Sequence, residues 1–291
     1  MRVPDEVRQC VVFIGLPITL PNAQEGFRFG GTAFFVGVKS ESIEGWNYVY
    51  LVTAKHVVTH IEGKKFMVRI NTKSGESVIV VAEGTRWWYH ATDESIDVAV
   101  IPFAPPQEIS PEFKMLPTSM FLTDDIIRAK AIGTGDEVFI TGLFAKLSGS
   151  KRNLPIVRMG NIAMMPDESV PTTIGNIEAY LIEARSIGGI SGSPAFVRET
   201  VPMGLGSIYL LGLMHGHWDI PPESRNDIED VASKEAVNIG IAIVVPAKRI
   251  LEVLTQPQLI AMRREGDEAR RKETMPTLDE EAAKANQRQD G

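Results

Sequence analysis

Residues 188–194 read Gly-Gly-Ile-Ser-Gly-Ser-Pro, and this string is the most specific local signal in the chain. Glycines at 189 and 192 allow the backbone to turn sharply on both sides of Ser191 and to approach a bound molecule closely. Such a turn can direct the backbone N–H groups of Gly189 and Ser191 at one point, where they would stabilise an oxyanion. We therefore predict that Ser191 is a nucleophile, the alternative being a glycine-rich surface turn.

A serine hydroxyl is a weak nucleophile and needs a general base beside it. His56 lies at the end of an apolar stretch that reads Tyr-Leu-Val-Thr-Ala-Lys-His, and Asp97 opens another that reads Asp-Val-Ala-Val-Ile. A carboxylate beside the imidazole would hold its tautomer and stabilise its charged form. Taken singly, each is an ordinary residue at a strand end or turn. Together, His56, Asp97 and Ser191 form a candidate catalytic set.

The composition is that of an ordinary globular protein. The 291 residues are 44% hydrophobic and 23% charged, which argues against a disordered, collagen-like or coiled-coil chain. Thirty basic residues stand against 37 acidic ones, a formal net charge of −7, so charge gives no reason to expect nucleic acid. The single cysteine, Cys10, excludes an internal disulfide and a cysteine-based zinc cage.

The N-terminal region bears only a weak likeness to a signal peptide. Asp5 and Glu6 lie where a positive region belongs, and Pro17 and Pro21 interrupt the apolar stretch that follows. No apolar run approaches the length of about 18 residues that a membrane span requires. We expect a cytoplasmic protein that does not contact membranes.

Short β-rich runs, separated by Gly, Pro, Asn and Asp, occupy residues 8–245. Many such runs without intervening amphipathic helices indicate an all-β sandwich or barrel. Residues 105–130 contain several prolines and little alternation, and are interpreted as a linker. Residues 219–236 are polar and are interpreted as a surface loop.

The C-terminal part has a different pattern. Residues 246–255 have helical spacing of apolar side chains and predict a short helix. Residues 256–291 are charged and Ala-rich, and are interpreted as a tail that is either helical or disordered.

Several motifs resemble those of the trypsin-like (chymotrypsin-fold) serine peptidases. In that family TAAH, D-[IV]-A-[LV] and G-x-S-G-x-P mark the triad, and this chain has TAKH ending at His56, DVAV starting at Asp97 and GISGSP around Ser191. Flanking stretches at 30–36, 134–142 and 238–246 extend the likeness over about residues 10–255. It is closest to bacterial HtrA/Deg-type and glutamyl-endopeptidase-type domains.

The resemblance implies a fold of two six-stranded antiparallel β-barrels followed by a short helix and the charged tail. The implied boundaries are a peptidase domain at 8–255, divided into a first barrel at 8–104, the linker at 105–130, a second barrel at 131–245 and the helix at 246–255.

The resemblance also implies a serine endopeptidase that works through an acyl-enzyme, without metal or organic cofactor. His56 would be the base, Asp97 its orienting group, and the N–H groups of Gly189 and Ser191 the oxyanion hole. A protein or peptide substrate would add as an extended strand along Met214, His215 and Gly216. Arg185 would lie near the primary specificity pocket and favour an acidic residue before the cut, unless it points to solvent.

Two departures from the family pattern keep alternatives open. Ile190 replaces the Asp or Asn that precedes the serine in relatives, and the residues after 255 are too few for a PDZ domain. A catalytically silent or gated binding module is the second hypothesis, and an esterase the third. His215 and His217 are spaced for one face of a strand, but no third ligand follows in sequence, so we expect no metal site. The tail is a candidate for oligomerisation or a regulatory partner.

Overall fold

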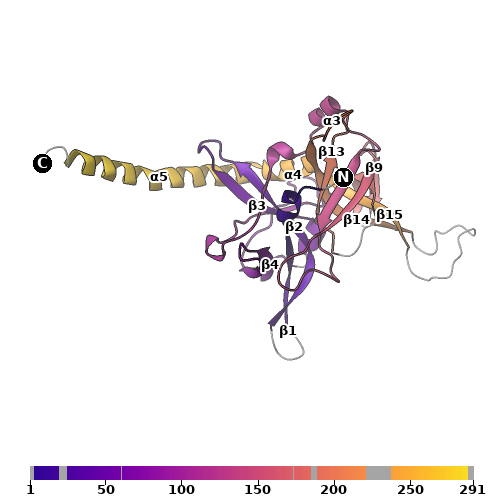
Figure 1. The fold of residues 1–291 in the computed structure, drawn as a ribbon, viewed down its shortest axis with the longest axis horizontal. Coiled ribbons are helices and arrows are strands. Elements are labelled where there is room, and N and C mark those ends of the chain that lie inside the picture. Colours follow the sequence, from indigo (N-terminus) through magenta and orange to yellow (C-terminus); the bar gives the residue numbers. More distant parts are fainter. Residues whose placement is uncertain are drawn as a thin grey trace, which may run out of the picture.

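Two β-rich halves form the body of the protein, and a long C-terminal helix extends away from it (Figure 1). The computed structural model describes residues 3–19, 25–59, 61–172, 174–184, 189–220 and 237–287. The N-terminal half contains α1 (Glu6–Gln9), β1 (Val11–Thr19), β2 (Glu25–Lys39), β3 (Asn47–Thr53), α2 (Lys55–Thr59), β4 (Phe66–Asn71), β5 (Ser77–Ala82) and β6 (Ala99–Pro102).

The C-terminal half contains β8 (Glu137–Gly142), β9 (Ile156–Met164), β10 (Ser169–Thr172), β11 (Gly175–Glu178), β12 (Tyr180–Glu183), β13 (Pro194–Arg198), β14 (Ile208–Ile220) and β15 (Val237–Pro246). Helices α4 (Ala247–Leu254) and α5 (Pro257–Gln287) follow.

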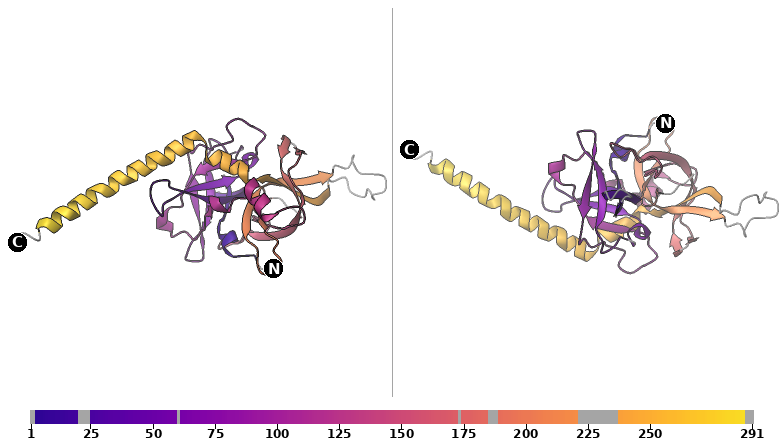
Figure 2. Two further views of the ribbon diagram at one scale, coloured as in Figure 1. Left: turned by 90° about the horizontal axis from the view of Figure 1, so that it is seen from above. Right: turned by 90° about the horizontal axis from the view of Figure 1, so that it is seen from below.

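The C-terminal half is a closed six-stranded barrel. Its strands follow the order β12-β15-β14-β13-β8-β9, all pairs being antiparallel, and Figure 2 shows the ring nearly end-on. Apolar side chains fill it because alternate residues of each strand point inward. The predicted second barrel is thus confirmed.

The N-terminal half is a seven-stranded sheet rather than a closed ring. Its main path is β5-β4-β1-β2-β3-β6, and the short strand β7 (Leu116–Pro117) pairs with β2 in parallel. After β5 the chain turns out of the sheet at Gly84, which has a φ of 64°. Farther on, Trp88 pairs with Val100 of β6 in an isolated antiparallel bridge. Within the described residues no strand pairing joins the edge strands β5 and β6, so this half does not form the closed barrel that the resemblance implied.

The segment predicted as a linker has secondary structure of its own. It contains the 3-10 turns η1 (Gln107–Ile109) and η2 (Thr118–Met120), strand β7 and helix α3 (Asp124–Lys130). Thr123 caps α3 by accepting a hydrogen bond from the N–H of Ile126. The segment packs against the body because Leu116 and Phe121 are buried.

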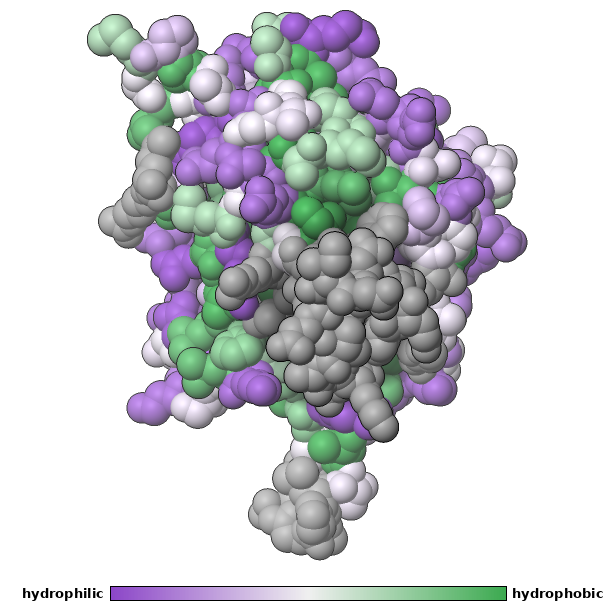
Figure 3. Space-filling view, turned by 90° about the vertical axis from the view of Figure 1, so that its right-hand side faces the viewer, coloured by the Kyte–Doolittle hydropathy of each residue, from purple (hydrophilic) through white to green (hydrophobic). Residues whose placement is uncertain are grey.

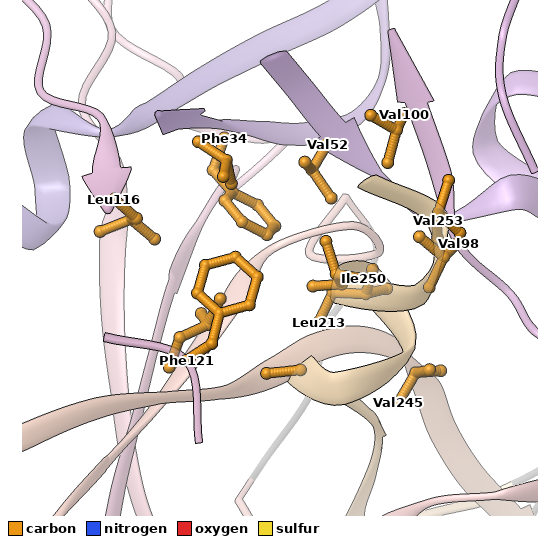
Figure 4. Close-up of a cluster of buried hydrophobic side chains, with 14 of the residues drawn as sticks. Phe34, Val52, Val98, Val100, Leu116, Phe121, Leu213, Val245, Ile250 and Val253 are labelled. Atoms are coloured by element: carbon orange, nitrogen blue, oxygen red, sulfur yellow. The ribbon is translucent and has the colours of Figure 1, made fainter. Parts of the chain in front are cut away.

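A shared hydrophobic core joins the two halves (Figure 4). The first half supplies Phe34, Val52, Val98 and Val100, the connecting segment Leu116 and Phe121, the barrel Leu213 and Val245, and α4 Ile250 and Val253. Each such side chain contributes about 1.5–3 kcal/mol on full burial. This core fixes the position of β6, and hence of the adjacent Asp97, relative to the barrel.

Helix α5 is anchored near its start and then projects from the body (Figures 1 and 2). The anchor is Asp267, only 5% exposed, whose carboxylate accepts hydrogen bonds from Ser40, Ser42 and Tyr48 at 2.6–2.9 Å. Desolvation, together with the bond to Asp267, raises the pKa of Tyr48 to about 12. Of the two alternatives predicted for the tail, the structure contains the helix, which runs from Pro257 to Gln287.

The surface is mixed in polarity. On the side from which the β14–β15 hairpin projects, hydrophobic residues gather in patches in the upper middle and at the lower left of the view, and hydrophilic ones occupy much of the rim (Figure 3). Of the helices within the described ranges, none has both the length and the apolar character needed to cross a membrane.

Candidate active site

The three predicted catalytic residues lie where the two halves of the protein meet. His56 lies in the first turn of α2, directly after β3. Asp97 precedes β6 by two residues, and Ser191 lies in the turn before β13. The backbone N–H of Thr32, on β2, donates to the carbonyl of Ser191 at 3.1 Å and ties the two halves together at this point.

His56 and Asp97 form a doubly bonded pair. His56 Nδ1 lies 2.7 Å from Asp97 Oδ2, and the backbone N–H of His56 donates to Oδ1 at 2.9 Å. Asp97 is 1% exposed. Burial acts to raise the pKa of Asp97, but hydrogen bonds from His215 and His56 and the charges of both imidazoles outweigh it, so this pKa lies below its usual range. Asp97 is therefore an anion that holds the His56 ring in one orientation.

A second imidazole shares the same carboxylate oxygen. His215 Nδ1 lies 2.6 Å from Asp97 Oδ2, and the two histidine rings meet edge to face with centroids 5.3 Å apart. The family resemblance implied that His215 lies on the substrate strand; in the structure its side chain is 10% exposed and directed at Asp97. Sequence spacing contains no signal for this contact, since the residues are 118 positions apart.

The hydroxyl of Ser191 forms no hydrogen bond with His56, the predicted base. Among the described residues, Ser191 Oγ donates to the backbone carbonyl of His215 at 3.3 Å. The His56 side chain is 35% exposed, so its ring is accessible from the cleft. Hydrogen bonds of a catalytic serine are often long or misdirected without substrate, because they tighten only in the reacting complex.

The turn around Ser191 depends on two glycines in the left-handed region. Gly189 has a φ of 98° and Gly192 a φ of 81°. A Cβ on Gly192 would lie 2.2 Å from Thr53 Oγ1 and 2.3 Å from the Thr32 carbonyl, so no side chain fits there. Ile190 is 1% exposed and packs in the barrel core, so apolar burial holds this side of the turn.

Thr32 also belongs to the site, because it contacts the Ser191 turn, although no sequence motif indicated it. It is fully buried, and its hydroxyl donates to the Gly189 carbonyl at 2.9 Å while accepting from the Leu143 N–H at 2.8 Å. This bond fixes the peptide group that joins Gly189 to Ile190, next to the N–H of Ser191. Within the described part of the chain, the N–H groups of Gly189 and Ser191 have no acceptor, as an oxyanion hole requires.

The predicted substrate-strand residues have different surroundings. Met214 is buried, and its backbone pairs with the Ser191 turn through Gly192 and Ser193 at 2.8 Å each. Gly216 has open space where a Cβ would lie. Arg185 lies outside the described residues.

His56, Asp97 and His215 are the described group whose ligand atoms lie close enough together, within 4.8 Å, to be considered for a metal. However, each histidine Nδ1 is 2.6–2.7 Å from Asp97 Oδ2. Ligands on tetrahedral zinc, at about 2.0–2.1 Å from the ion, are roughly 3.3 Å apart. The spacing is therefore that of atoms bridged by protons.

A cavity of about 410 Å³ opens beside the catalytic residues. It is lined by His56, Gly189 and Ser191 and by residues 14–16 of β1 and 28–30 of β2. The two candidate catalytic residues His56 and Ser191 thus border one shared space.

The fold and the geometry of the site define a trypsin-like serine protease fold. Similar solved structures include the MamO protease domain from Magnetospirillum magneticum in its apo form, with a TM-score of 0.50 and 15% identity over 86% of this chain and 98% of that one. Another is an inactive serine-to-alanine mutant of Rv3671c from M. tuberculosis H37Rv, with a TM-score of 0.41 and 18% identity over 86% and 90% of the two chains. No protein-family model and no curated protein matches the chain.

Proposed function

We propose that this protein is a serine endopeptidase that cleaves peptide bonds through an acyl-enzyme intermediate. The observation that carries the proposal is the His56–Asp97 pair, held by two hydrogen bonds, which opens with Ser191 into one cavity. In such an arrangement a weakly acidic hydroxyl gains a base whose tautomer and orientation are fixed.

Each residue has a defined part in the reaction. His56 Nε2 takes the proton of Ser191 as Oγ attacks the scissile carbonyl, and later returns it to the departing amine. The imidazolium that forms is stabilised by the Asp97 carboxylate. The N–H groups of Gly189 and Ser191 donate to the tetrahedral oxyanion, and water then hydrolyses the acyl-enzyme.

One rotation precedes the chemistry. Ser191 Oγ must leave the His215 carbonyl, where its bond of 3.3 Å is long for an O–H donor, and turn toward His56. A weak neutral hydrogen bond of this kind contributes about 0.5–1.5 kcal/mol, so an incoming substrate can displace it easily.

The test is covalent labelling of the purified full chain with a fluorophosphonate, followed by mass-spectrometric mapping. We expect an adduct at Ser191 in the wild type and none in Ser191→Ala. Ser193→Ala is the matched control, since this neighbouring serine is fully buried and its substitution leaves labelling in place. A folded wild type that remains unlabelled would contradict the proposal.

A gated or silent binding module is the second candidate, favoured by the resting contact of Ser191 with His215. Labelling rates with and without unreactive peptides distinguish the two. A rate that rises when a peptide is present supports a gated enzyme, and no labelling under either condition supports a binding module.

A further inference from the structure

The cavity beside His56 and Ser191 is shared with the β1–β2 hairpin. Residues 14–16 of β1 and 28–30 of β2 line it together with Val57 and Ile61. The β2 strand runs directly from these lining residues to Thr32, whose N–H bonds the Ser191 carbonyl. The hairpin and the nucleophile are therefore rigidly connected.

The chemistry of the proposed reaction assigns this cavity to one side of the substrate. His56 donates its proton to the departing amine, so the amine must lie on the His56 side of Ser191. The other flank of the Ser191 turn is occupied by β14, through the Gly192–Met214 hydrogen bond. The segment that follows the scissile bond is thus directed into the cavity along the hairpin.

The cavity has apolar walls and one permanent charge. Leu16, Phe29 and Ile61 contribute apolar surface, and Phe29 is held edge-on against Phe13 and Phe27, with centroids 5.7 and 4.7 Å away. Among the described lining residues, Arg28 is the one with a permanent charge, and no carboxylate is present. Within the described part of the chain, Arg28 is exposed and its guanidinium has no hydrogen-bond or ion-pair partner.

Resting on the proposed function, we propose that this cavity is a leaving-side subsite in which Arg28 selects substrates with an acidic side chain shortly after the cut. Arg28 lies four residues along β2 from Thr32, or about 13 Å at roughly 3.3 Å per residue. An extended substrate has nearly the same rise, so the acidic side chain belongs to the second to fourth residue after the scissile bond. The first residue after it contacts the apolar wall.

The preference is moderate because Arg28 is exposed to solvent. Exposed charge pairs of this kind correspond to about two- to fivefold in kcat/KM, and salt weakens them. A guanidinium can also bind a carboxylate in a two-pronged manner, which adds directionality to the selection.

The first experiment is digestion of a complex peptide library by the full-length protein, with cleavage sites identified by mass spectrometry. We expect Glu and Asp to be enriched two to four residues after the cut for the wild type. Arg28→Gln should lose this enrichment, and Arg28→Glu should replace it by enrichment of Lys and Arg. Arg86→Gln is the matched control, since this arginine stacks on Trp88 away from the cavity lining. Equal cleavage regardless of charge, or an unchanged profile in Arg28→Glu, would overturn the inference.

A second measurement does not depend on turnover. The affinity of the Ser191→Ala variant is measured at low and high salt for two fluorescent peptides. The peptides differ only in having Glu or Lys at the third position of the leaving segment. We expect tighter binding of the Glu peptide, reversed in the Ser191→Ala, Arg28→Glu double variant. Equal affinities would overturn the inference even if Ser191 is labelled and the protein is an active protease. A preserved preference for the Glu peptide without fluorophosphonate labelling would instead overturn the proposed function, and with it the leaving-side assignment, while keeping Arg28 as a determinant of peptide binding.

Discussion

His215 donates from Nδ1 to Oδ2 of Asp97 at 2.6 Å, and so places a second imidazole on the carboxylate that orients His56. The buried carboxylate of Asp97 accepts three hydrogen bonds. Two come from the side chains of His56 and His215, and one comes from the backbone N–H of His56. These hydrogen bonds offset the free-energy cost of removing the carboxylate from water.

Removing the donor of His215 should weaken both stability and catalysis. A hydrogen bond to a buried charged group contributes about 1.5–3 kcal/mol, so His215→Phe should be destabilised by that amount in urea unfolding. kcat should fall more than KM changes, because Asp97 is then less firmly placed behind His56. His215→Asn retains an N–H donor and should recover part of both losses. An Asn variant as impaired as the Phe variant would show that ring packing is the main contribution.

Asp97 should make the native state sensitive to acid. Its pKa in the folded protein lies below the ordinary value of 3.8, so its stabilising effect is present above about pH 4 and is lost as pH falls through the lowered pKa. The stability difference between wild type and Asp97→Asn should therefore be large at pH 7 and shrink below pH 4. Denaturant titrations at several pH values measure it. A difference independent of pH would contradict the assigned hydrogen bonds.

Asp97→Asn should also reduce turnover strongly. An amide at this position favours the wrong tautomer of His56, and such a loss of orientation costs about 10⁴-fold in kcat in a triad. Labelling of Ser191 by a fluorophosphonate should slow in parallel. A variant that keeps the wild-type rate would show that Asp97 has only a structural part.

Gly192 should tolerate no side chain. Gly192→Ala combines a left-handed φ with contacts of 2.2–2.3 Å to Thr53 and Thr32, and should cost at least about 3 kcal/mol. Gly75→Ala is the matched control: its φ is 87°, but nothing lies within 4 Å of the added methyl, so only about 1–2 kcal/mol is expected. Equal losses in the two variants would show that strain alone, and not close approach, governs the turn.

Asp267 should hold helix α5 on the body. Asp267→Ala leaves the hydroxyls of Ser40, Ser42 and Tyr48 without their shared acceptor, and amide exchange in the first turns of α5 should accelerate by about tenfold or more. Glu268→Ala, an exposed neighbour, is the control and should leave exchange unchanged. Unaltered exchange in Asp267→Ala would mean that α5 is held by other contacts.

The features predicted correctly from the sequence are those encoded locally. The β-rich runs alternate in polarity and are separated by turn residues, which is sufficient to indicate an all-β fold. The need for glycine at position 192 follows from the turn itself. Motif likeness then suggested the His56–Asp97 contact, which the structure contains at 2.7 Å. It also suggested two six-stranded barrels, and among the described residues only the strands of the second half form a closed ring.

The long-range contacts that build the site and anchor α5 depend on tertiary packing. The contact of His215 with Asp97 joins residues 118 positions apart, and the bond from Tyr48 to Asp267 joins residues 219 apart. Thr32 reaches Gly189 across 157 positions. A single polar residue on each of two distant segments produces no periodicity and no motif in the sequence. These partners were brought together only when the apolar faces of both halves and α4 were buried against one another, since that burial sets which loops meet at the cleft.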